Sequence, residues 1–101
     1  MTAMMTIRRI SIYADANLEK FMLEQCLTLG ARGYSVLSCR GKGMHESLDD
    51  PFAGANRVKI EVLANATTAE KILAYLTDGK FKSKAVAVCV ESVDVAAYEE
   101  F

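Results

Sequence analysis

Hydrophobic and polar residues alternate in four short segments of the chain, and a period of two predicts β-strands. The clearest segment reads VKIEV from Val58 to Val62, which would place apolar side chains on a core and charged ones on the opposite face. The other predicted strands span residues 7–13, 34–39 and 85–93. In the last of them, neither face carries a charge from Ala85 to Val90.

Between these strands the hydrophobic period changes to three and four residues, which predicts two amphipathic helices. The first would span residues 18–29, with Asn17 as its N-cap and the following glycine at its end. The second would begin at Thr67, which forms a capping-box pattern with Glu70, and would close at Gly79.

The element order β-α-β-β-α-β predicts an α+β, ferredoxin-like fold in a single domain of residues 1–101. Right-handed crossovers place both helices on one face of a four-stranded antiparallel sheet, with the first and third strands central. The final strand is then an edge that is apolar on both faces, and such an edge needs a cover. We therefore expect the helix-free face to pack against other copies in a closed ring, with a trimer as the preferred count.

Composition and charge exclude several classes of protein. With 101 residues and 51% hydrophobic side chains, the chain can build a core as one domain. Its net charge of −1 gives no overall attraction to nucleic acid or to anionic lipid. The N-terminus lacks the apolar run of a signal peptide, and no stretch approaches the roughly 18 apolar residues of a membrane span. We expect a cytoplasmic protein.

Residue types that carry catalysis or bind metals are few. The three cysteines are widely spaced, unlike a disulfide framework or a CxxC metal site, and are expected to be reduced and buried: Cys26, Cys39 and Cys89. The single histidine has no evident catalytic partner. Its acidic neighbours fit neither a zinc motif nor an EF-hand loop. The residues in question are His45, Glu46, Asp49 and Asp50. We expect no metal site and no enzyme.

A long polar segment of residues 41–56 separates the two middle strands and begins with Gly41-Lys42-Gly43. This triplet is neither a P-loop nor a full GxGxxG motif. Glycines there would let backbone amides approach an anion, and pairing of the flanking strands would bring both ends of the segment together. Basic residues lie near these ends: Arg40, Lys42, Arg57 and Lys59. The alternative is that the glycines only permit a turn and the cations only keep the edge soluble.

The segments GARGYSV, RGKG and RVKIEVLAN, in this order and with a long loop before the last, resemble the PII family of signalling proteins, especially its PII-like branch. The resemblance implies a ferredoxin-like trimer with its sheets inside. It also implies that the loop at about 41–56 is the T-loop that contacts partners, and that adenine nucleotides bind in clefts between subunits.

Single positions carry over from this resemblance. Gly33 and Ser35 match the glycine and the hydroxyl residue around the strand after GA, and Arg32 takes the variable site before that glycine. The two glycines of RGKG match the base of the T-loop, and residues 80–84 fall where the family has its phosphate-binding B-loop. The implied nucleotide-binding set is Arg32, Gly33, Ser35, Gly41, Lys42, Gly43, Arg57, Lys59, Glu61, Lys82 and Lys84.

Departures from the family pattern change the expected ligand. Met44-His45 replaces Arg-Gln at the T-loop base, KFKSK replaces the glycine-rich B-loop signature, the C-terminal arginines are absent, and the loop has no tyrosine. We therefore expect neither sensing of ATP with 2-oxoglutarate nor uridylylation. The chain is similar to divergent PII-like proteins linked to bicarbonate uptake or carboxysomes. That similarity implies ADP, AMP or cyclic AMP as ligand, bicarbonate as a second ligand, and a protein or membrane-transporter partner.

Other functions stay open on the sequence alone. A small trimeric enzyme or nucleotide hydrolase would have to use His45, and a structural trimer would bind no ligand. RNA binding is disfavoured, because the strand RVKIEV offers no aromatic side chains on which bases could stack.

Overall fold

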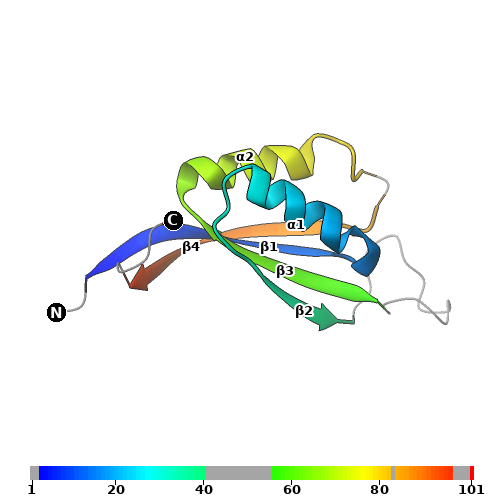
Figure 1. Cartoon of the computed structure of the whole chain (residues 1–101), viewed down its shortest axis with the longest axis horizontal. Coiled ribbons are helices and arrows are strands. Elements are labelled where there is room, and N and C mark those ends of the chain that lie inside the picture. The colour runs from blue at the N-terminus through cyan, green and yellow to red at the C-terminus, as the bar shows by residue number, and fades with distance from the viewer. Residues whose placement is uncertain (1–2, 41–55, 83, 97–100) are drawn as a thin grey trace.

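The computed structural model describes residues 3–40, 56–82, 84–96 and 101. Its elements are β1 (Met4–Asp15), a 3₁₀ turn η1 (Ala16–Leu18), α1 (Glu19–Thr28), β2 (Ser35–Cys39), β3 (Arg57–Ala64), α2 (Ala66–Thr77) and β4 (Ala87–Ala96). The strands form one antiparallel sheet in the order β2-β3-β1-β4 (Figure 1). The predicted ferredoxin-like order is confirmed, with β1 and β3 central and β4 at an edge.

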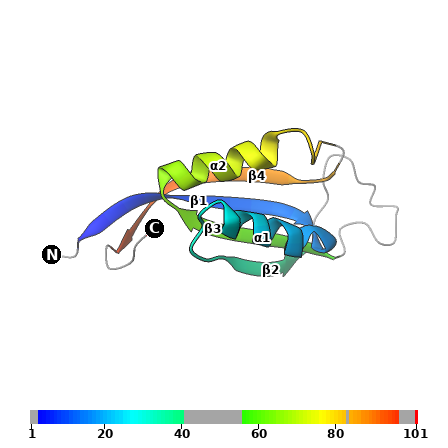
Figure 2. The same ribbon diagram turned by 45° about the horizontal axis from the view of Figure 1, so that its top comes forward.

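Both helices lie on the same face of the sheet, and the opposite face carries no helix (Figures 1 and 2). The alternation in β3 sends Val58, Ile60 and Val62 toward the helices, where all three are buried. Seven of the eight largest fully buried side chains among the described residues belong to the core cluster between sheet and helices: Ile10, Ile12, Met22, Cys26, Ile60, Val62 and Ile72. None of the helices within the described ranges is both long and apolar enough to cross a membrane.

The predicted helix starts are wrong in their capping residues. Asn65 caps α2, because its side-chain oxygen accepts a 2.8 Å hydrogen bond from the amide of Thr68. Thr67 lies inside the first turn of α2, so the predicted capping box of Thr67 and Glu70 does not begin this helix. At the other helix, the N-cap position of α1 is Leu18 rather than Asn17 and makes no side-chain cap hydrogen bond, while Asp15 caps the 3₁₀ turn that precedes α1. The predicted end of α1 is confirmed, since Gly30 has a φ of 116°.

Substitution of the observed cap tests this assignment. Asn65→Ala should lower the free energy of unfolding by about 1 kcal/mol, because the amide of Thr68 loses its acceptor. Thr67→Ala is the matched control and should change stability by less than about 0.5 kcal/mol. Urea denaturation measures both. A larger loss for Thr67→Ala than for Asn65→Ala would restore the capping box.

β1 and β4 continue as a two-stranded ribbon beyond the end of β3. Met4 pairs with Ala96 at the tip of the ribbon, whereas β3 ends at Ala64, opposite Arg8. The sequence prediction stopped β4 at residue 93, whereas the strand continues to Ala96. In the structure the hydroxyl of Thr6 donates to Asp94 Oδ1 at 2.6 Å, so the charged residue fits a strand position.

The three cysteines are free, as predicted, but only Cys26 is buried. Burial raises the pKa of the Cys26 thiol, which keeps it in its less reactive protonated form. Cys39 is half-buried, and Cys89 is exposed on the helix-free face. The prediction that all three are buried is therefore wrong for this single chain, because alternate positions of the edge strands face away from the helices.

Candidate functional site

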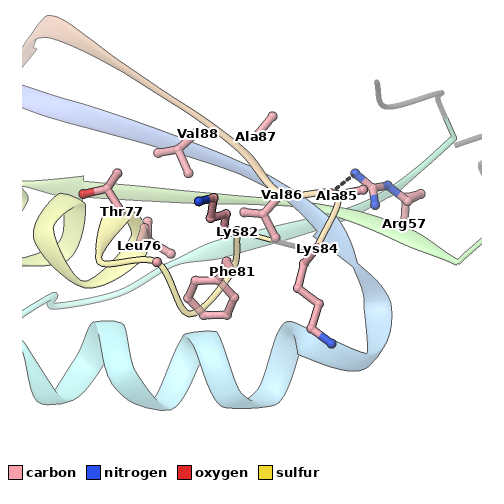
Figure 3. A pocket seen from close by; sticks show the side chains of 11 residues that line it. Arg57, Leu76, Thr77, Phe81, Lys82, Lys84, Ala85, Val86, Ala87 and Val88 are labelled. Atoms are coloured by element: carbon pink, nitrogen blue, oxygen red, sulfur yellow. Dashed lines mark hydrogen bonds between the residues drawn. The ribbon is translucent and has the colours of Figure 1, made fainter. Parts of the chain in front are cut away.

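Three of the predicted binding residues line one hollow beside the start of β4. Arg57, Lys82 and Lys84 surround a space of about 530 Å³ (Figure 3). The rest of its lining comes from the end of α2, the loop that follows it and the first residues of β4: Leu76, Thr77, Gly79, Phe81, Ala85, Val86, Ala87 and Val88. The hollow thus gathers parts of the chain that lie far apart in sequence.

The lining of this hollow combines cations with apolar side chains. No aspartate or glutamate occurs among the described residues that line it. Lys82 and Lys84 are exposed and point in different directions, while the side chains of Phe81, Val86 and Val88 supply apolar walls (Figure 3). Long lysine side chains can reorient at little cost when they are exposed to solvent. Such a surface suits a ligand that has both an anionic group and an apolar part.

The loop between α2 and β4 is held by its own hydrogen bonds. The backbone amide of Lys80 donates to Asp78 Oδ1 at 3.1 Å, and this bond lowers the pKa of the Asp78 carboxyl. Phe81 is buried and meets the Tyr75 ring edge-on at 5.6 Å between centroids, and Lys80 Nζ lies 4.4 Å from the centroid of the same ring. The loop is therefore anchored through Phe81.

Arg57 connects β3 to the segment before β4. Its Nη2 atom donates a 2.7 Å hydrogen bond to the carbonyl oxygen of Ala85. Arg57 is also the residue opposite Cys39 in the pairing of β2 with β3, so the two ends of the long loop do meet, as the sequence predicted. The guanidinium is half-buried at this junction and belongs to the lining of the hollow.

Four other predicted residues line a second hollow of about 360 Å³ at the β2 edge. Tyr34, Leu63 and Phe101 complete a wall made by Arg32, Gly33, Ser35 and Glu61. A Cβ atom added at Gly33 would meet nothing within 4 Å, so contacts within the chain do not require glycine there. The side-chain amide of Asn65 donates to the Phe101 carbonyl oxygen, which fixes that part of the wall.

Lys59 lines neither hollow. It lies on the helix-free face, where its Nζ is 3.7 Å from Glu61 Oε2 and 5.7 Å from the centroid of the Tyr13 ring. The predicted residues of the long loop lie outside the described residues: Gly41, Lys42, Gly43, His45, Glu46, Asp49 and Asp50. Within the described part of the chain, no three His, Cys, Asp or Glu side chains cluster as metal ligands.

Some lining residues were not predicted from the sequence. Phe81 is the main one, and its signal was present, because a single aromatic side chain stands between lysines in KFKSK. Thr77, Val86 and Val88 were assigned to elements without a role in binding. Their place in the hollow depends on how the end of α2 faces β4, which periodicity does not specify.

Sequence comparison identifies a family but no individual curated relative. The sequence model described as nitrogen regulatory protein P-II matches residues 7–100. Among curated proteins, none matches the chain by sequence.

Solved structures are similar to the chain over almost its whole length. A protein of Thermus thermophilus with a proposed PII-like signalling role is 29% identical, with 92% of this chain and 91% of that chain covered and a TM-score of 0.76. CPII, a nitrogen regulatory PII-like protein from Thiomonas intermedia K12 bound to ADP, AMP and bicarbonate, is 16% identical, with 93% and 97% covered and a TM-score of 0.80. A DUF3240 family protein from Shewanella baltica OS155 is 14% identical, with 100% and 97% covered and a TM-score of 0.64. The structures of CPII and of the DUF3240 family protein share the fold of this chain.

Proposed function

Because its residues 7–100 match the family model, the chain belongs to the P-II family of nitrogen regulatory proteins, and we propose that it is a PII-like sensor of an adenine nucleotide. Proteins of this family are regulatory signalling proteins. The observation that carries the proposal is the hollow beside β4, with three cations, apolar walls and no carboxylate among its described lining residues.

The phosphate groups of the nucleotide would lie against Arg57, Lys82 and Lys84. The planar guanidinium can donate two parallel hydrogen bonds to phosphate oxygens, and the lysines supply movable positive charge. The apolar side chains of Phe81, Val86 and Val88 then offer contact to the less polar part of the ligand. Binding of this kind needs no chemical step, which agrees with a regulatory role.

ADP, AMP or cyclic AMP is the proposed ligand in preference to ATP. The positions that commonly hold a third phosphate in the family are changed here, with KFKSK in place of the B-loop glycines. The structural neighbour CPII was solved with ADP, AMP and bicarbonate, which supports the same ligand class for this chain. We include bicarbonate as a proposed second ligand, and the proposed set also keeps Gly41, Lys42 and Gly43.

A complete site requires more than one copy of the chain. The first hollow lies at the β4 edge and the second at the β2 edge, with both central strands between them. Along β3, Arg57 and Glu61 are also four residues apart, or about 13 Å at 3.3 Å per residue. In a homotrimer, the β4 edge of one protomer can approach the β2 edge of the next, so that Arg32, Gly33 and Ser35 would face the same ligand.

Signalling would follow from different ligand affinities of two loop conformations. A ligand shifts the population toward the conformation that it binds more tightly, and the long loop of residues 41–56 would present that conformation to a protein or transporter partner. We propose a cytoplasmic role in inorganic carbon metabolism. Arg57 lies at the described end of this loop and lines the hollow proposed for the phosphates, whereas Lys59, two residues farther along β3, lines neither hollow.

A ligand panel tests this function directly. Thermal unfolding is followed with ADP, AMP, ATP and cyclic AMP, each with and without bicarbonate. A bound ligand at 100 times its Kd stabilises the folded state by about 2.7 kcal/mol. We expect a larger shift with ADP or AMP than with ATP. Absence of any shift would favour a structural trimer without a ligand, and conversion of the nucleotide during incubation would favour a hydrolase.

A further inference from the structure

Asn65 makes two hydrogen bonds with opposite ends of its side-chain amide. The oxygen accepts from the backbone amide of Thr68 at 2.8 Å, which caps α2. The nitrogen donates at 2.5 Å to the carbonyl oxygen of Phe101, 36 residues farther along the chain. In both ribbon views the C mark, at Phe101, lies near the start of α2 (Figures 1 and 2). One side chain therefore connects the start of this helix to a residue that follows β4.

Phe101 limits the space of the second hollow. β4 occupies one edge of the sheet, whereas the hollow that Phe101 lines lies at the β2 edge. Phe101 is half-buried in this position. With about 360 Å³, the hollow lies near the lower end of the range of about 300–1,000 Å³ that is typical of small-molecule sites. Displacement of Phe101, which is one of its walls, would enlarge it.

We propose that the Asn65–Phe101 contact restricts access to the second hollow, and that a nucleotide enters this hollow fully only after Phe101 is released. The inference rests on the proposed function, in which Arg32, Gly33 and Ser35 of this hollow face the ligand. It goes further by identifying a competing group from the same chain and the hydrogen bond that keeps this group in place.

The strength of one hydrogen bond sets the size of the expected effect. Loss of an ordinary hydrogen bond between neutral groups changes an equilibrium by about two- to tenfold. When release precedes binding, the observed Kd is the intrinsic Kd divided by the fraction of molecules in the released state. Removal of the Asn65 donor raises this fraction, so it should lower the observed Kd by the same factor.

Two substitutions remove the donor but keep the helix cap. Serine and aspartate are about as good as asparagine at an N-cap, because their side-chain oxygens accept from the same backbone amide. Neither carries the amide nitrogen that holds Phe101. Asn65→Ser and Asn65→Asp should therefore release Phe101 while α2 stays capped, and urea denaturation verifies that stability is kept. The neutral Asn65→Ser also separates release from the effect of a new negative charge on an anionic ligand.

A fluorescent reporter tests the contact without any ligand. The chain contains no tryptophan, so Phe101→Trp introduces a single one. Its emission should lie at shorter wavelength than that of tryptophan in water, and acrylamide should quench it less. Asn65→Ser in the same background should shift the emission to longer wavelength and increase quenching. Thr67→Ala is the matched control in the first turn of α2 and should leave the emission unchanged.

Calorimetric titration with ADP measures access to the hollow. Asn65→Ser should lower the Kd by about two- to tenfold. Phe101→Ala should lower the Kd as well, because it removes most of the competing side chain. An unchanged or higher Kd in both variants would overturn the inference, since Phe101 would then have no effect on the ligand or would bind it directly.

The two measurements distinguish failure of the inference from failure of the proposed function. An unshifted reporter in Asn65→Ser would overturn the inference whatever the affinity for ADP, because the contact would not hold Phe101. A shifted reporter without binding of ADP to any variant would support the contact and overturn the proposed nucleotide, together with the restriction of its entry.

Discussion

Ile72→Ala should lower the free energy of unfolding by about 2–5 kcal/mol. Ile72 is fully buried on the face of α2 that packs on the sheet, next to the core residues of β1 and β3. Alanine removes apolar contacts and leaves a cavity that the two-layer packing fills only in part. Urea denaturation at fixed protein concentration measures the loss, since the stability of an oligomer depends on concentration.

Leu27→Ala is the control for this substitution. Leu27 lies in α1 and is 46% exposed, so the same kind of truncation in a helix removes less buried surface. We expect a change within about 0.5 kcal/mol. A similar large loss for Leu27→Ala would mean that the outer face of α1 is covered by another chain in solution. A small loss for Ile72→Ala would contradict the observed core.

The fold could be predicted from the sequence because apolar and polar residues recur at short, regular intervals along the chain. The VKIEV alternation in β3 has period two because one face of that strand meets the helices, and the structure buries its apolar residues as predicted. Once strand and helix order is known, the handedness of crossovers leaves few topologies. The predicted central position of β1 and β3 therefore came from sequence order alone.

Element ends were predicted less well, because neighbouring capping residues compete for one helix start and because some strand ends depend on contacts between segments. Thr67 and Glu70 satisfy a capping pattern, but Asn65 lies one residue before α2 and captures the Thr68 amide first. Asp94 lies beyond the predicted end of the last strand, yet it pairs with Thr6 of β1 and accepts a hydrogen bond from its hydroxyl. The partner of Asp94 comes from a distant position in the chain, for which local periodicity carries no signal, whereas the Asn65 cap is local and competes with a second capping pattern beside it.

The candidate site was also predicted only in part: its residues could be indicated from the sequence, but their grouping and contacts could not. The sequence indicated Arg57, Lys82 and Lys84 through resemblance to a family, and the structure brings these three around one hollow. It separates them from Arg32 and Ser35, which line a second hollow at the other edge. The bond from Arg57 to the Ala85 carbonyl could not be predicted, because it depends on how the loop before β4 passes the end of β1.

Arg57→Ala is the substitution with the largest expected effect on binding. Loss of a charge-assisted hydrogen bond to a phosphate should cost about 1.5–3 kcal/mol, which corresponds to a roughly 10- to 150-fold higher Kd for ADP. The bond to Ala85 is lost as well, so part of the effect would come from a less ordered loop. Calorimetric titration measures the Kd, and thermal unfolding without ligand shows how much of the change is structural.

A charge-matched control decides between a specific contact and a general loss of positive charge. Lys71→Ala removes one cation from the exposed side of α2 and does not line the hollow. Its effect on ADP binding should be within about twofold, because salt and water screen an exposed charge that does not contact the ligand. Equal losses for Lys71→Ala and Arg57→Ala would mean that the whole charge of the protein, rather than the hollow beside β4, attracts the nucleotide. An unchanged Kd in Arg57→Ala would remove this residue from the site and leave Lys82 and Lys84 to hold the phosphates.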